Sequence, residues 1–446
     1  MTLLTGAPVA SQRPISGRWS FPALLAAAVA VCLIAGQLLV WGNAMRVRGG
    51  PETYVRGLDF MATLTGARVV ADGAGPRLYD LDTQQAAQAR VVAGYVTLKP
   101  GTVLPYIHPP FEALALAPLM RLPYAAIYAI WTLGMVLAFA GALRLLAAAL
   151  PLPAPARWLM LLAAGSFVPF HAALWYGQSS PLLLLGLAGA YAALRRGREG
   201  RAGAWLALLV LKPQLVPVVV LLLALERRWR TLAVAAGVAG GACVAAMPVL
   251  GVAWPLQYAR FVLVDLGRLG ASANVYPIIM PSLRGFAVNL LGGWAPALVT
   301  PAYAGLAALL VALFVWIWSR SRARLGQWRD DALWALACLV AVLVATHVYG
   351  HDLPVLLLPA WLVAARALSG AWGARRARGW LALLWAGYAW ALNFAFVPSA
   401  GLTIVPTVLL LLAAIALLGR ELAGGAGGLL GATRAATAGD ADALPV

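Results

Sequence analysis

Long apolar runs recur along the whole chain, and they constrain its fold more than any other feature. Hydrophobic residues make up 63% and charged residues 11% of the 446 positions, and the mean hydropathy is +0.84. Apolar runs of about 18 residues or more are typical of transmembrane helices, because a helix needs about 20 residues to cross the hydrocarbon core. The composition excludes a soluble domain and predicts an all-α polytopic membrane protein with about 11–13 transmembrane or re-entrant helices.

Basic residues gather between the apolar runs, and they predict the orientation of the chain. Cytoplasmic loops of membrane proteins are enriched in Lys and Arg, so we assign these basic segments to the cytoplasm. The same rule accounts for the net charge of +18 without nucleic acid as a partner. The segments are 13–18, 144–157, 195–198, 227–230, 320–329 and 375–378.

With this orientation the spans alternate between the two sides of the membrane. The first run is expected to stay as a helix, because it lacks the Ala-x-Ala cleavage site of a signal peptide. Residues 1–19 form a cytoplasmic N-terminus, 20–420 the transmembrane domain, and 421–446 a disordered cytoplasmic tail that is rich in Gly and Ala. The predicted spans are 20–42, 123–147, 158–175, 180–194, 231–250, 297–318, 331–348, 353–367, 379–396 and 402–418.

Three segments do not read as simple spans. Residues 43–110 form a long first extracytoplasmic loop, and long loops in compact proteins are usually functional. Residues 111–120 are too few to cross and predict a half-helix or surface helix. Residues 202–225 lie between two Arg clusters, so they predict a re-entrant pair of short helices that meets at Lys212-Pro213-Gln214. Non-helical backbone at that depth is tolerated only where it lines a protein cavity, so we expect Lys212 in a cavity.

Polar residues scattered through the sequence converge on the outer side in this scheme. Ionisable groups at membrane depth are costly and are candidates for function by default. Three of the four histidines belong to the set, and His171 lies one turn below it. The set is Asp59, His108, Gln178, Lys212, Tyr276, Arg284, His347, His351 and Asp352.

Asp59 and Lys212 carry the strongest chemical hypotheses. Asp59 follows the first span, where a carboxylate could remove a proton from an acceptor hydroxyl. It could equally cap a helix or solvate the loop. Lys212 lies between Val210-Leu211 and Leu215-Val216, and a cation in such a cavity suits a lipid phosphate. The alternative is a lysine that snorkels to the interface.

The other candidates have weaker patterns. His108 precedes two prolines that stiffen the chain, so it either contacts substrate or only marks a rigid joint. Gln178 sits in an aromatic turn and is expected to line the site. His347 and His351 have helical i,i+4 spacing, which could bind a metal. Because only two ligands are close in sequence, we expect no metal there, and favour substrate or phosphate contact over helix capping.

The ordered set of these motifs resembles a known family. The chain is similar to the polyprenyl-phosphate-mannose-dependent, mannosyltransferase-like membrane proteins of glycosyltransferase family 87, within the GT-C superfamily. It departs from the common family pattern in two places. Residues 108–110 are His-Pro-Pro, where the family usually has Tyr-Pro-Pro. Residues 280–284 are Met-Pro-Ser-Leu-Arg, where family members often have Asn-Gln-Ser-Leu before a basic residue. The motifs that carry the resemblance are Asp59-Phe60, Pro109-Pro110, Ala117-Pro118, Gly177-Gln178, Leu211-Lys212-Pro213, 226–230 and His347 to Asp352.

The resemblance implies a GT-C fold, a lipid-linked sugar donor and Asp59 as the base. The expected reaction moves a hexose, with mannose favoured, from a polyprenyl phosphate to a hydroxyl of a lipid or glycan acceptor outside the bacterial cytoplasmic membrane. We expect Asp59 and His351 to be catalytic, with the donor phosphate near Lys212, Arg284 and His347. The expected substrate-lining residues are His108, Gln178, Tyr276 and Asp352.

Direct displacement inverts the anomeric carbon, whereas a retaining reaction needs a second carboxylate about 5 Å from the first. Asp352 is the only plausible second carboxylate. No cofactor or metal is expected beyond the lipid-linked donor. Two alternatives stay open: a transporter or flippase of lipid-linked sugars, and a ligase that joins whole glycans. The early position of the long loop favours the transferase over both.

Overall fold

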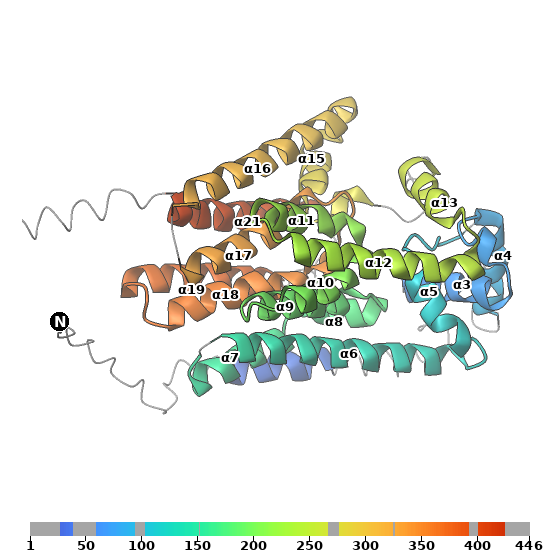
Figure 1. Ribbon diagram of the computed structural model, residues 1–446, viewed down its shortest axis with the longest axis horizontal. Coiled ribbons are helices and arrows are strands. Elements are labelled where there is room, and N and C mark those ends of the chain that lie inside the picture. Colours follow the sequence, from blue (N-terminus) through green and yellow to red (C-terminus); the bar gives the residue numbers. More distant parts are fainter. Residues whose placement is uncertain are drawn as a thin grey trace, which may run out of the picture.

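The computed structural model shows an elongated bundle of helices with a smaller lobe at one end (Figure 1). No strand occurs among the residues that the structure describes. The fold class predicted from the sequence, an all-α polytopic membrane protein, is confirmed. The structure describes residues 27–38, 59–93, 103–150, 152–265, 276–323, 326–391 and 400–423.

Five helices among the described residues are long and apolar enough to cross a membrane. A sixth span results if α7 and α8, which meet at a bend of 41°, count as one. Pro169 lies in the first turn of α8, and because it has no N–H it cannot continue the hydrogen bonding of α7 across the bend. The five are α6 (Tyr124–Ala149), α12 (Trp229–Leu250), α16 (Val299–Ser321) with η8 (Pro296–Leu298), η9 (Gly350–Leu356) with α18 (Leu357–Leu368), and α21 (Ala400–Ala423).

Shorter helices occupy the other predicted spans. At about 1.5 Å per residue, the 15 residues of α9 fall short of the hydrocarbon thickness. Helices α17 and α19 have 18 residues each, but both begin with charged side chains that shorten their apolar part. These helices are α7 (Ala154–Gly165), α8 (Val168–Tyr176), α9 (Ser180–Leu194), α17 (Gln327–Val344) and α19 (Ala374–Ala391).

The helices differ sharply in how much of their surface is buried. Only 6% of the apolar window of α12 and 11% of that of α16 are buried inside the protein, so both helices present apolar side chains outward. In contrast, 78% of the window formed by η9 and α18 is buried. Helices α9 and α17 are buried along most of their length and form the main core together with α18. A lipid-facing rim therefore surrounds a protein-packed centre.

The small lobe contains what the sequence predicted as the first loop. It is built from helices α3 (Phe60–Ala71), η1 (Gly75–Arg77), α4 (Leu81–Val91), α5 (Phe111–Leu116) and η2 (Ala117–Leu119). These pack with the end of α12, α13 (Trp254–Arg260) and η5 (Phe261–Asp265) around a second core that includes Tyr79 and Tyr106. The described part of the predicted loop is thus a folded helical lobe. Residues 43–58 and 94–102 of that loop lie outside the described residues.

The segment 202–225 is broken at the place predicted from the sequence. Helix α10 (Glu199–Leu206) continues into η3 (Ala207–Leu211), and η4 (Pro213–Leu215) leads into α11 (Val216–Leu225). Lys212 lies between them with φ −137° and ψ 78°, because a residue before proline is forced out of the helical region. That this pair re-enters from one side of a membrane stays a prediction.

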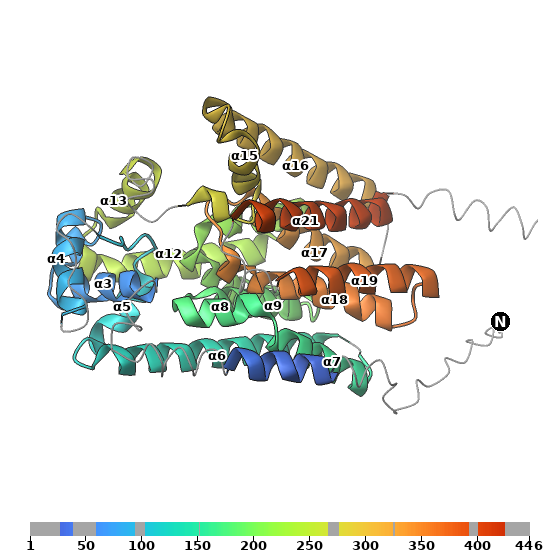
Figure 2. The same cartoon turned by 180° about the vertical axis from the view of Figure 1, so that it is seen from behind.

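The charged joints gather at the end of the bundle opposite the lobe. Ion pairs join Arg195 to Asp331, Arg329 to Glu226, and Arg376 to the end of α21. The N-terminal helix 27–38 lies beside α6 and α7, as Figure 2 shows, and Gln37 donates a hydrogen bond to the Ser166 carbonyl. Helix α21 continues to Ala423, three residues into the predicted tail. The rest of the tail and residues 1–19 lie outside the described residues.

The orientation predicted from the Arg distribution can be tested by cysteine labelling. In a chain whose native cysteines are replaced by alanine, Ala89→Cys on α4 should react with a membrane-impermeant thiol reagent in intact spheroplasts. Arg201→Cys on α10 should react only after lysis. Both positions are exposed, so accessibility of the folded protein does not distinguish them. Labelling of Arg201→Cys alone in intact cells would reverse the whole scheme.

Candidate active site

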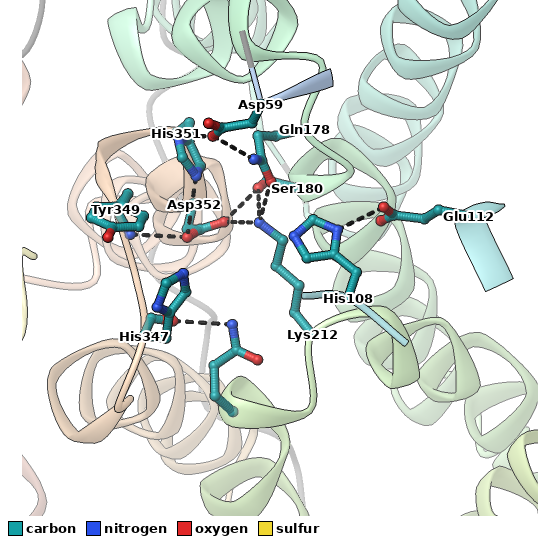
Figure 3. Close-up of polar contacts among 11 residues, drawn as sticks. Asp59, His108, Glu112, Gln178, Ser180, Lys212, His347, Tyr349, His351 and Asp352 are labelled. Carbon is teal, nitrogen blue, oxygen red and sulfur yellow. Dashed lines mark hydrogen bonds and ion pairs between the residues drawn. The ribbon is translucent and has the colours of Figure 1, made fainter. Parts of the chain in front are cut away.

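A cavity of about 290 Å³ lies between the lobe and the bundle. Its walls come from six places in the sequence: the start of α3, the segment 104–109, the turn after α8, the break at Lys212, residues 258–262 of α13 and η5, and the segment 346–352. Figure 3 shows the polar side chains of these segments converging on one region. Most of the segments are helix ends or non-helical stretches, so their side chains can point into the space between helices.

Five side chains on this cavity form a closed ring of polar contacts. Gln178 Nε2 donates to Asp59 Oδ2 at 2.8 Å, and Gln178 Oε1 accepts from Lys212 Nζ at 2.8 Å. Lys212 forms an ion pair with Asp352 Oδ1. His351 closes the ring, with Nε2 3.7 Å from Asp352 Oδ2 and Nδ1 3.9 Å from Asp59 Oδ2 (Figure 3).

Asp352 is held in place from several sides. Its Oδ2 accepts the backbone N–H of Tyr349 at 2.9 Å, which caps η9, and its Oδ1 accepts from Ser180 Oγ at 2.9 Å. The residue is only 1% exposed. A buried carboxylate is stable only when it is paired and hydrogen-bonded, and the Lys212 ammonium supplies the pairing charge.

The turn that presents Gln178 depends on a glycine. Gly177 ends α8 in the left-handed conformation, with φ 66° and ψ 34°. Its carbonyl accepts the indole N–H of Trp131 at 2.9 Å. A Cβ added at this position would lie 2.5 Å from the Phe60 Cβ, next to Asp59. The absence of a side chain at Gly177 therefore lets the α8 turn approach the start of α3 closely enough for Gln178 to reach Asp59.

His108 also lines the cavity, and it pairs with Glu112, which lies outside the lining. His108 Nδ1 lies 2.7 Å from Glu112 Oε2, and the Glu112 side chain is 3% exposed. Burial, the largest single cause, raises the pKa of Glu112, but His108, Ser179 and Lys212 together hold that pKa below its usual range. An ionised carboxylate can only accept, so this contact assigns a proton to His108 Nδ1 and leaves the other ring nitrogen directed away from Glu112.

Two glutamines hold the wall that carries His108. Gln84 exchanges hydrogen bonds with the backbone of Tyr106, at 2.7 Å and 3.3 Å, and Gln88 does the same with Leu104, at 2.9 Å and 2.8 Å. The two are one turn apart on α4, so their amides imitate the edge of a strand for an extended segment that has no strand partner.

His347 lines the opposite wall of the cavity. Burial, the largest cause, lowers the pKa of His347 to about 3, and Asp352 opposes the shift only in part. The imidazole is therefore neutral at pH 7 and can donate one N–H. Its backbone carbonyl accepts from Gln214 Nε2 at 3.0 Å, which ties this wall to the break at Lys212.

The sequence of this chain matches the model of a glycosyltransferase family. The match to glycosyltransferase family 87 covers residues 106–346, more than half of the chain. The chain belongs to glycosyltransferase family 87. It is accordingly a membrane glycosyltransferase, and the resemblance drawn from the motifs is confirmed. Asp59 and the segment from His347 to Asp352 lie outside the matched residues, so their place in the same cavity comes from the structure.

One curated relative extends the match. The family 87 chain is 29% identical over 308 residues to the polyprenol-phosphate-mannose-dependent alpha-(1-2)-phosphatidylinositol pentamannoside mannosyltransferase of Mycolicibacterium smegmatis. The alignment covers 68% of this chain and 71% of that relative. No solved structure matches this chain at a significant level.

The structure brings most of the predicted site residues of this family 87 enzyme together. Two lie just outside the lining. Arg284 Nη1 donates to the Thr346 carbonyl at 2.8 Å, and the Tyr276 backbone N–H donates to the Tyr349 hydroxyl at 3.0 Å. His171 does not line the cavity, and its Nε2 contacts the Gly165 carbonyl at 2.7 Å. The lining includes Asp59, His108, Gln178, Lys212, His347, His351 and Asp352.

Sequence reasoning missed several polar groups of this site. Glu112 had a usable signal, since it lies four residues after His108 at the start of a helix and is the only charged residue of 111–120. Ser180 had no signal, because its role depends on Asp352, which is far away in the sequence, whereas Tyr349 lies only three residues before Asp352, at the spacing of a helix cap. Among the described residues, no group of three or more His, Cys, Asp or Glu side chains is arranged to hold a metal ion. The prediction that the enzyme needs no metal stays untested.

The role of Gly177 gives a matched stability test. Gly177 and Gly197 have nearly the same left-handed backbone, with φ 66° and 67°, but a Cβ at Gly197 would meet no atom within 4 Å. Alanine at either position costs about 1 kcal/mol in backbone strain. Only Gly177→Ala adds overpacking against Phe60, which typically costs about 1–3 kcal/mol more. Thermal unfolding in detergent should rank Gly177→Ala clearly below Gly197→Ala, and equal values would contradict the close contact with Phe60.

Proposed function

We propose that this family 87 enzyme transfers mannose from a polyprenyl phosphate to a hydroxyl of a lipid or glycan acceptor. The relative from Mycolicibacterium smegmatis uses a polyprenol-phosphate-mannose donor, and family membership supports the same class of reaction here. The apolar helices and the basic joints support a multi-pass protein of the bacterial cytoplasmic membrane, with the cavity facing the extracytoplasmic side. A lipid-linked donor suits a cavity that borders apolar spans.

The observation that carries the mechanism is the position of Asp59 on the cavity. Its side chain is 30% exposed, and its contacts with Gln178 and His351 both involve Oδ2. We assign Asp59 Oδ1 as the atom that contacts the acceptor hydroxyl. Oδ1 takes the hydroxyl proton while the hydroxyl oxygen attacks the anomeric carbon of the sugar. The carbon–oxygen bond to the phosphate breaks in the same step, and the polyprenyl phosphate leaves with the electron pair.

The environment of Asp352 supports inversion. A retaining reaction needs a second carboxylate that is free to attack the sugar. Asp352 is buried, paired with Lys212, and hydrogen-bonded by the Tyr349 N–H and the Ser180 hydroxyl. A carboxylate held by three partners is a poor nucleophile, because attack would break these contacts. Asp352 is therefore assigned a structural part and Asp59 the chemical one.

The leaving phosphate is assigned to the wall formed by 346–351. His347 can donate an N–H there, and Arg284 lies behind Thr346 with a guanidinium that has further donors. His351 lies between the two carboxylates and can stabilise charge as the phosphate departs. This wall is the polar end of a donor site whose lipid chain would run between helices.

The assignment of the base is tested by Asp59→Asn. The change is nearly isosteric and removes the proton acceptor, so the turnover rate should fall by about 10²–10⁴. Binding of the donor and thermal stability should stay close to those of the wild type. The measurement is transfer of radiolabelled mannose from polyprenyl-phosphate mannose by purified protein to a membrane lipid extract. Asp82→Asn, an exposed carboxylate on α4, is the matched control and should keep full activity.

The same assay separates the alternatives. A flippase would form no glycosylated product with either protein. A transferase whose Asp59→Asn variant works at nearly the wild-type rate would have another base, and Asp352 would be the next residue to replace.

A further inference from the structure

We infer that Lys212 and Gln178 are positioning residues: Lys212 fixes the orientation of the Gln178 amide, the amide holds Asp59, and Lys212 does not contact the donor phosphate. This inference rests on the proposed role of Asp59 as the base. It gives Lys212 a different part from the phosphate ligand that the sequence predicted.

The ammonium of Lys212 has no donor left for a phosphate. An ammonium has three N–H groups. Lys212 Nζ contacts Asp352 Oδ1, Gln178 Oε1 at 2.8 Å and Ser180 Oγ at 3.4 Å. The residue is 3% exposed. A phosphate could gain a hydrogen bond from Lys212 only by displacing one of these partners.

The charge of Lys212 is also balanced inside the protein. Asp352 is 1% exposed and forms the ion pair with Lys212, so the two side chains together carry no net charge. Removing Lys212 alone would leave a buried carboxylate without a counter-charge, which is strongly destabilising. The first effect of losing Lys212 is therefore on Asp352 and its neighbours.

The contacts of Gln178 explain what the ammonium does for the base. Lys212 can only donate hydrogen bonds, and an ionised Asp59 can only accept them. The Gln178 amide lies between them with Oε1 toward Lys212 and Nε2 toward Asp59. The reverse orientation would place N–H against ammonium and oxygen against carboxylate. Lys212 thus selects the amide orientation that fixes Asp59 Oδ2 and leaves Oδ1 for the acceptor.

The role of Lys212 is tested by restoring the charge balance without the cation. Lys212→Met should unfold at a lower temperature than the wild type, because Asp352 becomes an unpaired buried charge. The double variant Lys212→Met/Asp352→Asn removes that charge and should recover most of the stability. The double variant should also bind polyprenyl phosphate, the leaving group, within about threefold of the wild type. If Lys212 contacts the phosphate, binding should instead weaken by about ten- to a hundredfold in the double variant, which overturns the inference.

A matched control separates this effect from the general loss of an ion pair. Arg329 pairs with Glu226 at the other end of the bundle. Arg329→Met should lower the unfolding temperature and leave polyprenyl phosphate binding unchanged. Binding and stability are measured without turnover, so they decide the role of Lys212 even if the wild-type protein transfers no sugar.

The role of Gln178 is tested by Gln178→Met, which keeps the length and removes the N–H donor. The turnover rate should fall by about ten- to a hundredfold, because a base displaced by about 1 Å loses its alignment. The acceptor KM and the affinity for polyprenyl-phosphate mannose should stay within about twofold of the wild type. A higher acceptor KM or weaker donor binding with unchanged turnover would mean that Gln178 contacts substrate, and the positioning role would be wrong.

Discussion

The buried ion pair between Lys212 and Asp352 is the contact on which the site depends. It joins the break before α11 to the start of η9, and through Ser180 it also reaches the first turn of α9. An ion pair removed from water is stable only when its remaining hydrogen-bonding groups are satisfied, and here an amide, a hydroxyl and a backbone N–H satisfy them. The Lys212 side chain at the helix break is thereby fixed in position, and side chains from three segments are held around one point.

The lobe supplies the other half of the cavity, and it is attached by contacts of a different kind. Phe60 packs edge-on against Tyr124 and Tyr128 of α6 and lies against the side-chain-free surface of Gly177. Gln84 and Gln88 fix the extended segment that leads to His108. Apolar packing thus places Asp59 beside Gln178, while amide hydrogen bonds place His108, the partner of Glu112, on another part of the cavity lining. A family 87 enzyme can in this way build a polar site without a soluble catalytic domain.

The two ends of the bundle use charge differently. At the end away from the lobe, the ion pairs of Arg195, Arg329 and Arg376 leave part of their side chains exposed, whereas Lys212 and Asp352 at the cavity are almost fully buried. At the cavity, the charges are few and buried, so each one depends on its partner. The polar side chains of the site gather at helix ends that are enclosed by protein. Hydrogen bonds are stronger in such an enclosed site than in water, and so is the stabilisation of charge that develops during a reaction.

The sequence by itself determined the all-α membrane fold, because hydropathy and the distribution of Arg report where each segment lies relative to the bilayer. It also determined the break at Lys212, because proline fixes its local backbone, and it brought together seven of the residues that line the cavity. Only the tertiary structure decided the partners. Asp59 with Gln178, and Lys212 with Asp352, are pairs far apart in sequence, and hydropathy carries no information about such pairs. The folding of the first loop into a lobe and the place of Arg284 behind Thr346 depend likewise on contacts between distant segments.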